Sequence, residues 1–289
     1  MENLQKKEQM YEGKAKKVYA TNQEGIVIVD YKDDATAFNG EKKGTIVGKG
    51  VINNKMSNYI MKQLEAAGVP THLVEELSDR ETAVKKVSIV PLEVIVRNVA
   101  AGSFSKRMGV EEGKALLRPI IEFSYKCDEL NDPFINDDYA LALGLATEEE
   151  YKTLEKYTLA LFERGTEIAA KRGLILVDTK YEFGMHDGVI TLMDEIHTPD
   201  SSRYFYSEGY EEKFEAGEPQ RQLSKEFVRE WLMDNGFQGK EGQQVPEMTD
   251  EIVTSISERY IELYEHITGE KFVKEDTSNI AERIEKNPV

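Results

Sequence analysis

The sequence predicts an α+β protein of two lobes, a small β-rich N-terminal lobe over residues 1–90 and a larger α+β lobe over residues 91–289. The length of 289 residues suggests about two domains, at roughly 100–200 residues each. Strand patterns dominate before Pro91, and long helical patterns are added after it. Strands and helices follow one another without the regular βαβ order of a doubly wound sheet, which favours the α+β class.

The N-terminal lobe is predicted from short β-branched and apolar runs with polar turns between them. A helix over residues 52–67 ends before Gly68, because glycine is the residue favoured just after a helix. Pro91 interrupts the strand pattern, which places the lobe boundary near residue 90. The predicted strands of this lobe cover residues 14–19, 25–31, 71–77 and 82–90.

The C-terminal lobe begins with a predicted strand and turn over residues 92–104 and a short helix near Ser105. Residues 124–138 are acidic and rich in turn formers, which predicts an exposed loop. Thr147 opens a Thr-x-x-Glu capping box, so a helix starts there and runs to about residue 171. The remaining predicted elements are two hairpin strands at 174–183 and 189–196 and helices at 225–235 and 250–268.

Composition excludes several classes of function. The chain has 54 acidic and 37 basic side chains, a formal charge of −17, which opposes binding to nucleic acid or to an anionic membrane. It has no apolar run long enough to span a bilayer and no apolar segment at its N-terminus. The single cysteine, Cys127, cannot form an internal disulfide. We therefore expect a protein of the reducing cytoplasm; no oligomeric state follows from the sequence.

Acidic and basic side chains alternate along the predicted strand at 174–183. Asp178, Lys180 and Glu182 lie two residues apart and so share one face, and the partner strand adds Asp194 and Glu195 at its end. Grouped carboxylates repel one another unless a cation lies among them, and carboxylate oxygens together with substrate phosphates suit Mg²⁺. The pattern therefore predicts magnesium between Glu182 and Asp194. A solvated outer face of an antiparallel sheet explains the same alternation about equally well.

The register of this hairpin decides whether Glu182 and Asp194 share a face. A two-residue turn at Asp187-Gly188 pairs residue 186 with residue 189 and puts Asp194 on the wrong face. A three-residue loop pairs Lys180 with Asp194 and leaves Glu182 one diagonal away, roughly 7–8 Å between backbones. We therefore expect an odd-numbered loop or a bulge.

Two further segments have the composition of anion sites. Arg97 supplies a forked donor, and Gly102 and Ser103 supply backbone N–H groups and a hydroxyl before a short helix. A strand end with a serine N-cap explains the same residues. Residues 199–203 place two serines and Arg203 in a tight turn, although serine and aspartate are also common turn formers.

A glycine turn near the N-terminus precedes a lysine-rich strand. Gly13, Lys14, Ala15 and Lys16 lead to Val18, and alternation puts the two lysines and Val18 on one side. Such a turn could cover nucleotide phosphates, as glycine-rich turns do in kinases, but the pattern is common. The four histidines show no zinc-ligand spacing, which indicates structural or surface positions.

With these motifs in view, the chain resembles the phosphoribosylaminoimidazole-succinocarboxamide synthase (SAICAR synthetase) family. Two signatures carry the resemblance, VPLEVIVR at residues 90–97 continuing to AGS at 101–103, and LVDTKYEFG at residues 176–184. GKAKKVY from Gly13, NNK from Asn53 and DEIHTPDSSR from Asp194 also match. The similarity covers about residues 10–235, and the C-terminal part resembles the longer form of the family.

The resemblance implies an ATP- and Mg²⁺-dependent ligase that joins a carboxylated aminoimidazole ribonucleotide (CAIR) to L-aspartate in purine (IMP) biosynthesis, within two lobes related to the ATP-grasp and kinase-like folds. It implies that Gly13, Lys14, Ala15, Lys16 and Val18 bind ATP, and that Glu182 and Asp194 hold magnesium. It also implies that Arg97, Ser103 and Arg203 bind the 5′-phosphate side of the nucleotide, while Asp178 and Lys180 approach the imidazole carboxylate and are the catalytic candidates. Lys126 belongs to a segment that closes over the site.

Two alternatives remain open at this point. A phosphotransferase of the related kinase-like architecture shares the glycine turn and the paired metal carboxylates, but the sequence contains no His-Arg-Asp or Asp-Phe-Gly motif. A binding module that kept the fold without catalysis is disfavoured by the intact Lys180, Glu182 and Asp194.

Overall fold

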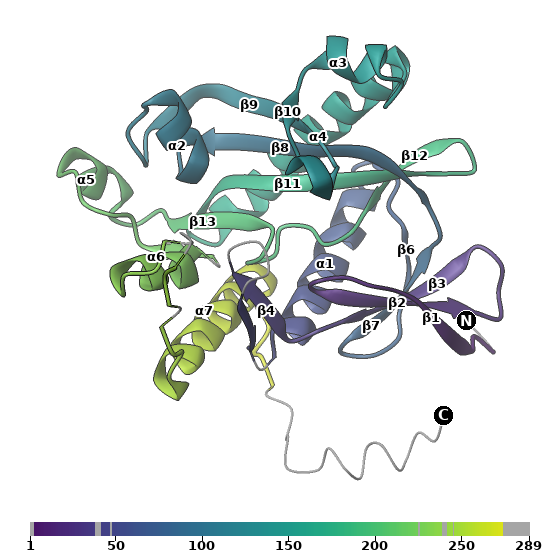
Figure 1. Cartoon of the computed structure of the whole chain (residues 1–289), viewed down its shortest axis with the longest axis horizontal. Helices are drawn as coiled ribbons and strands as arrows, with labels where there is room; N and C mark the ends of the chain where they lie inside the picture. Colours follow the sequence, from purple (N-terminus) through teal and green to yellow (C-terminus); the bar gives the residue numbers. More distant parts are fainter. Residues whose placement is uncertain are drawn as a thin grey trace.

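The computed structural model describes residues 3–37, 42–46, 48–224, 226–238, 242–244 and 246–273. Two antiparallel sheets dominate it, a smaller one built near the N-terminus and a larger one that crosses the rest of the molecule (Figure 1). The mixture of sheets and helices confirms the predicted α+β class. Strands of the smaller sheet end at Lys85 and those of the larger begin at Ser88, while the lobe boundary near residue 90 remains a prediction.

The smaller sheet includes a strand that we did not predict. Strand β1 is exposed along its whole length, so neither of its faces leaves an apolar alternation in the sequence. A small hairpin, also unpredicted, is formed by β4 (Asp34–Ala37) and β5 (Lys42–Thr45). In spatial order the five strands of the smaller sheet are β1 (Lys6–Glu12), β2 (Lys16–Thr21), β3 (Ile26–Tyr31), β7 (Glu81–Lys85) and β6 (Leu73–Glu76).

The larger sheet carries the residues singled out in the sequence. In spatial order its main path contains β10 (Phe134–Ile135), β9 (Ala115–Tyr125), β8 (Ser88–Val99), β11 (Leu174–His186), β13 (Ser202–Tyr206) and β14 (Gln222–Leu223). A further strand, β12 (Val189–Met193), pairs with β11. Strands β9 and β13 were not predicted, and Ser202 and Arg203 belong to β13 rather than to the preceding turn.

Pro91 does not interrupt the strand pattern as predicted, because β8 runs through it. The register between β8 and β11 shifts between the pairs Glu182–Glu93 and Gly184–Ile89, which indicates a bulge around Pro91. A bulge tolerates the missing N–H of proline, and the Pro91 carbonyl accepts from the amide of Lys126 at 3.0 Å.

The hairpin of β11 and β12 has the two-residue turn that we expected it to avoid. His186 pairs with Val189 across Asp187-Gly188, and Glu182 pairs with Met193, so the predicted odd-numbered loop is wrong. The strand ends at Met193, and Asp194 follows with a φ of 66°, in the left-handed region. Because the chain leaves the strand geometry at Asp194, the direction of its side chain is no longer set by strand alternation.

The predicted long helices are confirmed. Helix α4 starts at the capping box, in which Thr147 accepts from the amide of Glu150 and the Glu150 carboxylate accepts from the amide of Thr147. Lys225, the predicted first residue of another helix, lies outside the described residues. Within the described ranges, the helices are α1 (Lys49–Glu65), α2 (Gly102–Met108), α3 (Asp137–Ala142), α4 (Glu148–Lys171), α5 (Tyr210–Glu215), α6 (Glu226–Asp234) and α7 (Asp250–Thr268), and a 3₁₀ turn lies at Asp128–Leu130.

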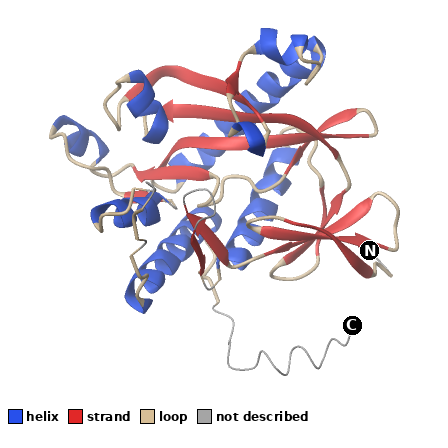
Figure 2. Cartoon of the chain, viewed as in Figure 1, coloured by secondary structure: helices blue, strands red, loops and turns tan. Residues whose placement is uncertain are grey.

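The main hydrophobic core lies between the larger sheet and the long helices, which Figure 2 shows in blue on one side of the red sheet. Tyr181 and Phe183 of β11 point into this core and are fully buried, as alternation predicts. Helices α1 and α7 pack against each other beside it. The opposite face of β8 and β11 is therefore left for polar side chains.

Two buried histidines make the stability of the fold dependent on pH. Burial lowers the pKa of both His72 and His197 to about 3. In the unfolded chain a histidine becomes protonated near pH 6.5, whereas these two histidines stay neutral in the folded protein down to about pH 3. The free energy of unfolding should therefore fall by about 1.4 kcal/mol per pH unit for each histidine as the pH drops through this window. Urea unfolding of His72→Gln between pH 4 and pH 6 should show a pH slope smaller by about one proton; an unchanged slope would contradict the buried, neutral state of His72.

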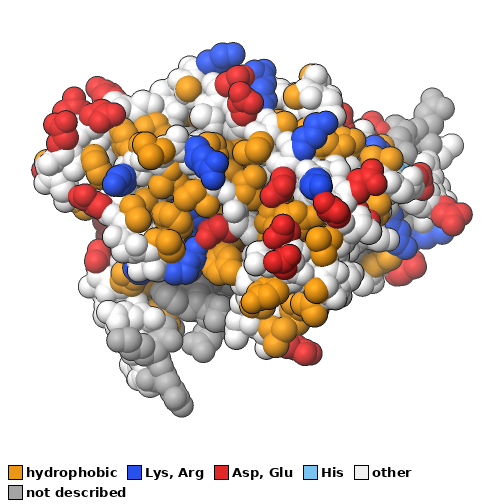
Figure 3. Space-filling view, turned by 90° about the horizontal axis from the view of Figure 1, so that it is seen from above, with side chains coloured by type: hydrophobic (Ala, Val, Ile, Leu, Met, Phe, Trp, Pro, Cys, Tyr) orange, Lys and Arg blue, Asp and Glu red, His pale blue; other side chains and the backbone are white. Residues whose placement is uncertain are grey.

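Charged side chains of both signs are mixed on the surface that Figure 3 shows. On the face seen in Figure 3, acidic and basic side chains are interspersed among hydrophobic ones and form no single large basic patch. Within the part of the chain that the structure describes, no helix combines the length and apolar character needed to cross a membrane.

Candidate functional site

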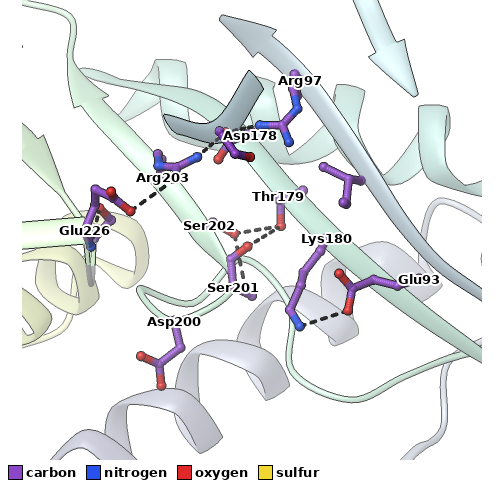
Figure 4. A pocket seen from close by; sticks show the side chains of 13 residues that line it. Glu93, Arg97, Asp178, Thr179, Lys180, Asp200, Ser201, Ser202, Arg203 and Glu226 are labelled. Carbon is purple, nitrogen blue, oxygen red and sulfur yellow. Dashed lines mark hydrogen bonds and ion pairs between the residues drawn. The ribbon is translucent and has the colours of Figure 1, made fainter. Parts of the chain in front are cut away.

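A polar cavity of about 250 Å³ opens on the face of β8 and β11 away from the core (Figure 4). It gathers side chains from strands and loops that are far apart in the sequence. The cavity contains five of the predicted residues, namely Arg97, Ser103, Asp178, Lys180 and Arg203. Its other lining residues are Glu93, Ile95, Thr179, Asp200, Ser201, Ser202, Ser224 and Glu226.

Asp178 joins two arginines from the neighbouring strands. Its Oδ2 accepts from Nη1 of Arg97 at 2.9 Å and from Nη1 of Arg203 at 2.6 Å. Both pairings follow from the register, because Asp178 of the central strand β11 lies opposite Arg97 of β8 and Arg203 of β13. The sequence placed these three residues in separate motifs, and the structure brings them together.

Each arginine has a second acidic partner, which fixes the orientation of its guanidinium. Nε of Arg97 donates to Glu122 at 2.9 Å, and Nη2 of Arg203 donates to Glu226 at 3.1 Å. The neighbouring carboxylates of Asp178 and Glu226 outweigh burial and raise the pKa of Arg203 further above its ordinary value. The site therefore presents two positive groups that stay charged at any physiological pH.

Gly102 and Ser103 border this pair of arginines. A Cβ atom at Gly102 would overlap the Arg203 guanidinium, and the φ of 57° lies in the left-handed region that favours glycine. The N-cap of α2 is Ala101, and the hydroxyl of Ser103 makes no capping hydrogen bond, so the alternative of a serine N-cap is wrong. Ser103 is exposed and lines the cavity instead.

Lys180 follows Asp178 along the same face of β11. Its ammonium lies 3.2 Å from a carboxylate oxygen of Glu93, the residue on β8 that sequence analysis did not single out. Burial alone lowers the pKa of Lys180, but the carboxylates of Glu93, Glu182 and Glu195 outweigh this effect and raise the pKa above its ordinary value. Lys180 is thus a permanent cation beside the arginine pair.

The predicted metal residues each pair with a lysine. Lys126 contacts Glu182 at 2.5 Å, and Lys16 forms an ion pair with Asp194. Burial raises the pKa of Glu182, but Lys126 and Lys180 outweigh it and hold the pKa below its ordinary value. Burial lowers the pKa of Lys16 to about 8, and the carboxylates of Glu195 and Glu182 oppose that shift. Lys16 therefore lies within the electrostatic reach of both predicted metal-binding segments.

The donor set suits a hard divalent cation that also binds a ligand. Glu182 and Asp194 offer carboxylate oxygens with small exposed fractions, 8% and 15%. Among the described residues, no three acidic, histidine or cysteine side chains form a cluster that could hold an ion on their own. Two carboxylates completed by substrate phosphates are a common arrangement for Mg²⁺, so these residues fit that ion.

The predicted nucleotide turn lies at the start of β2. The amide of Gly13 donates to the carbonyl of Lys16 at 2.9 Å, and the carbonyl of Ala15 accepts from the amide of Lys32 at 2.8 Å. The side chain of Lys14 is exposed, whereas Val18 packs against the apolar cluster of β3 and β7. Lys16 and Val18 thus lie on one face, and Lys16 reaches from the smaller sheet to Asp194 after the larger one.

Sequence reasoning missed several acidic partners of the basic side chains at the site. Glu93 and Glu226 sit in a strand and at a helix start, where a lone glutamate indicates nothing in particular. Asp200 belongs to a turn, and only the fold brings it to Lys49 of α1, at 2.9 Å. Glu195 was not missed, because sequence analysis places it with Asp194 at the strand end; burial together with Asp200 raises its pKa.

Comparison with known proteins gives a consistent family match. The family model described as SAICAR synthetase matches residues 9–246. A phosphoribosylaminoimidazole-succinocarboxamide synthase from Bacteroides thetaiotaomicron is 53% identical over 302 aligned residues, covering 99% of this chain and 95% of the relative. One from Lachnoclostridium phytofermentans is 64% identical over 200 residues, 69% of this chain and 85% of the relative.

Solved structures give the same result for the fold. A structure described as SAICAR synthetase (Type-2) in complex with ADP superimposes with a TM-score of 0.76 at 39% identity, covering 92% of this chain and 100% of that one. A SAICAR synthase from Saccharomyces cerevisiae, complexed with SAICAR, has a TM-score of 0.74 at 28% identity, with coverage of 92% and 96%.

Proposed function

Because the chain belongs to the SAICAR synthetase family, we propose that the cavity between β8, β11 and β13 is the place where it carries out the reaction of that family. The chain is an ATP-dependent carbon–nitrogen ligase of purine biosynthesis, which joins the carboxylate of CAIR to the amine of L-aspartate and gives SAICAR, ADP and phosphate. The observation that carries the placement is the convergence of Arg97 and Arg203 on Asp178, beside Lys180.

The chemistry requires activation of a carboxylate. A carboxylate is a poor electrophile, because expelling oxide is prohibitive. Transfer of the γ-phosphoryl group of ATP to the CAIR carboxylate breaks the bond to ADP and forms an acyl phosphate. Attack by the amine of aspartate on the acyl carbon then forms the amide and releases phosphate, while the amine loses a proton. The protein must therefore hold three anionic substrates close together and offset their charge.

Arg97, Ser103 and Arg203 are our candidates for binding the 5′-phosphate side of CAIR. The support is that both guanidinium groups are held in fixed orientations at one end of the cavity, with the Ser103 hydroxyl at its wall. A guanidinium suits phosphate because it offers parallel donors. Asp178 keeps the two like charges together, since its carboxylate lies between them.

Lys180 and Asp178 are our catalytic candidates. Lys180 points into the cavity and remains charged, so it can offset charge on the CAIR carboxylate and on the phosphoryl group being transferred. Asp178 is the candidate to accept the proton of the amine, because its carboxylate lines the cavity beside Lys180.

ATP is proposed to bind under the turn of β2, with Gly13, Lys14, Ala15, Lys16 and Val18 as its contacts. Lys16 lies close to the segments of Glu182 and Asp194, which would bring the phosphates to that point. Val18 offers an apolar surface on the same face. Glu182 and Asp194 would hold Mg²⁺ together with the ATP phosphates, and the ion would neutralise phosphate charge there. Lys126 would then exchange its contact with Glu182 for the ligand.

The test of the function is a reconstitution with defined substrates. The protein should release ADP only when ATP, Mg²⁺, CAIR and L-aspartate are all present, and SAICAR should accumulate in equal amount. ADP release that ignores aspartate and CAIR would contradict the proposal. Transfer of the γ-phosphate to a stable product would favour the kinase-like alternative. Nucleic acid and membranes are not expected among its partners, and the cytoplasm stays the predicted compartment.

A further inference from the structure

Asp200, at the wall of the cavity, contacts side-chain donors from Asn53, Lys49 and Tyr260. Its Oδ2 accepts from Nδ2 of Asn53 at 2.8 Å and lies 2.9 Å from Nζ of Lys49, and its Oδ1 accepts from the hydroxyl of Tyr260. The side chains of Asp200 and Lys49 are 9% and 7% exposed, so this cluster is shielded from water. Both carboxylate oxygens are engaged by the protein, which indicates a structural role rather than contact with substrate.

The three donors come from two helices that are distant in sequence. Lys49 and Asn53 belong to the first turns of α1, and Tyr260 belongs to α7 near the C-terminus. These helices pack side by side (Figure 1). Lys49 also donates to the carbonyl of Asp34 at 2.7 Å, so the cluster connects the N-terminal segment, the C-terminal helix and the cavity wall.

Asp200 lies two residues before the start of β13. The next residues are Ser201, Ser202 and Arg203, all of which line the cavity (Figure 4). The hydroxyl of Ser202 lies 2.7 Å from that of Thr179, and the amide of Ser202 donates to the carbonyl of Thr198 at 3.0 Å. A shift of the Asp200 carboxylate would therefore move the start of the strand that carries Arg203.

We propose that Tyr260 is a positioning residue for the ribonucleotide, because its hydrogen bond to Asp200 holds the start of β13 and so places Ser202 and Arg203 in the cavity. This inference rests on the proposed function, since it takes the cavity as the CAIR site. It assigns a role in substrate binding to the C-terminal helix, although α7 contributes no residue to the cavity lining.

The contact is present over the whole physiological pH range. Burial and the neighbouring Asp200 keep the pKa of Tyr260 well above its ordinary value, so the phenol stays protonated and remains a donor. Any effect of removing the hydroxyl should accordingly be independent of pH between 6 and 9.

The test compares two tyrosines of the same helix. Tyr260→Phe keeps the ring in its packing and removes only the hydroxyl. Its KM for CAIR should rise about three- to tenfold, the size expected for one hydrogen bond, while kcat and the KM for ATP change less than about twofold. Calorimetric titration of the protein with CAIR alone should show the same loss of affinity.

Tyr264→Phe is the matched control. Tyr264 lies one turn after Tyr260 along α7 and outside the cavity lining, and its side chain is 3% exposed against 2% for Tyr260. Its hydroxyl donates to Glu270 at 3.0 Å. We expect it to lower the melting temperature by an amount similar to Tyr260→Phe and to leave the KM for CAIR unchanged. Equal changes in KM for both variants, or no change for Tyr260→Phe, would overturn the inference.

Asp200→Asn provides a second variant. The amide keeps the size of the side chain but loses the charge that pairs with Lys49, so the affinity for CAIR should fall more than in Tyr260→Phe. A folded Asp200→Asn protein with unchanged CAIR affinity would also overturn the inference. Failure of the proposed function is distinguishable, because a wild-type protein without ligase turnover still permits the comparison of CAIR affinities by calorimetry.

Discussion

The Glu182→Gln variant should lose most of its turnover, with kcat reduced about 100-fold or more, while the fold stays intact. The amide keeps the volume of the side chain but removes the negative charge that a divalent ion requires, and an ion that neutralises phosphate charge contributes several kcal/mol to the transition state. Stability should change little, by about 1 kcal/mol or less, because the partner Lys126 is 37% exposed and can turn to water.

This result is measured as ADP release at saturating substrates, with the Mg²⁺ concentration varied. Half-saturation by Mg²⁺ should move to higher concentrations. Glu230→Gln serves as the control, because it makes the same chemical change at an acid that accepts from Gln222 and does not line the cavity. An unchanged rate and an unchanged Mg²⁺ requirement in Glu182→Gln would remove Glu182 from the metal site.

Lys180→Met is expected to have the second large effect, a fall in kcat of about 100- to 1000-fold. Methionine has nearly the same length and no charge, so the variant tests the ammonium group itself. Removal of one preorganised charge at a developing negative charge costs about 3–4 kcal/mol in comparable active sites. The KM for ATP should change much less, because Lys180 lies in the cavity proposed for CAIR and pairs with Glu93.

Rapid-quench measurement of the first turnover separates the chemical step from product release for this variant. Lys85→Met is the matched control, since Lys85 also extends from a strand but donates to the carbonyl of Thr71 outside the cavity lining. Lys180→Arg should recover part of the activity by restoring the charge. A first turnover as fast as that of the wild type would show that Lys180 does not act on the reacting groups.

Sequence patterns predicted the long and strongly periodic parts of the fold. Helix α4 was placed by its capping box, and the core-facing residues of β11 followed from alternation. Strand β1 was not predicted because both of its faces are exposed. The continuation of β8 through Pro91 was not predicted because a bulge accommodates the proline. These local rules fail where tertiary pairing decides the structure.

For the site, the sequence identified most of the residues but did not predict which of them contact one another. Arg97, Asp178 and Arg203 were found in three separate motifs. Both arginines bind the Asp178 carboxylate because their strands flank β11, and no local pattern encodes that strand order. The hairpin has a two-residue turn instead of the odd-numbered loop that alternation demanded, and Asp194 follows its second strand with a left-handed backbone. The cluster at Asp200 was missed because its donors are about 60 and 147 residues away.

The pairing of opposite charges at this site bears on how tightly it can hold its substrates. Asp178, Glu182 and Asp194 each have a basic partner among the described residues. Under the proposed assignment, an incoming phosphate or carboxylate would replace one of these acids as the partner of the basic group, in the manner of an ion exchanger. The binding free energy of the anion would then be a small difference between two similar ion-pair energies. Weak net binding of this kind would let the anionic products leave and the next cycle begin.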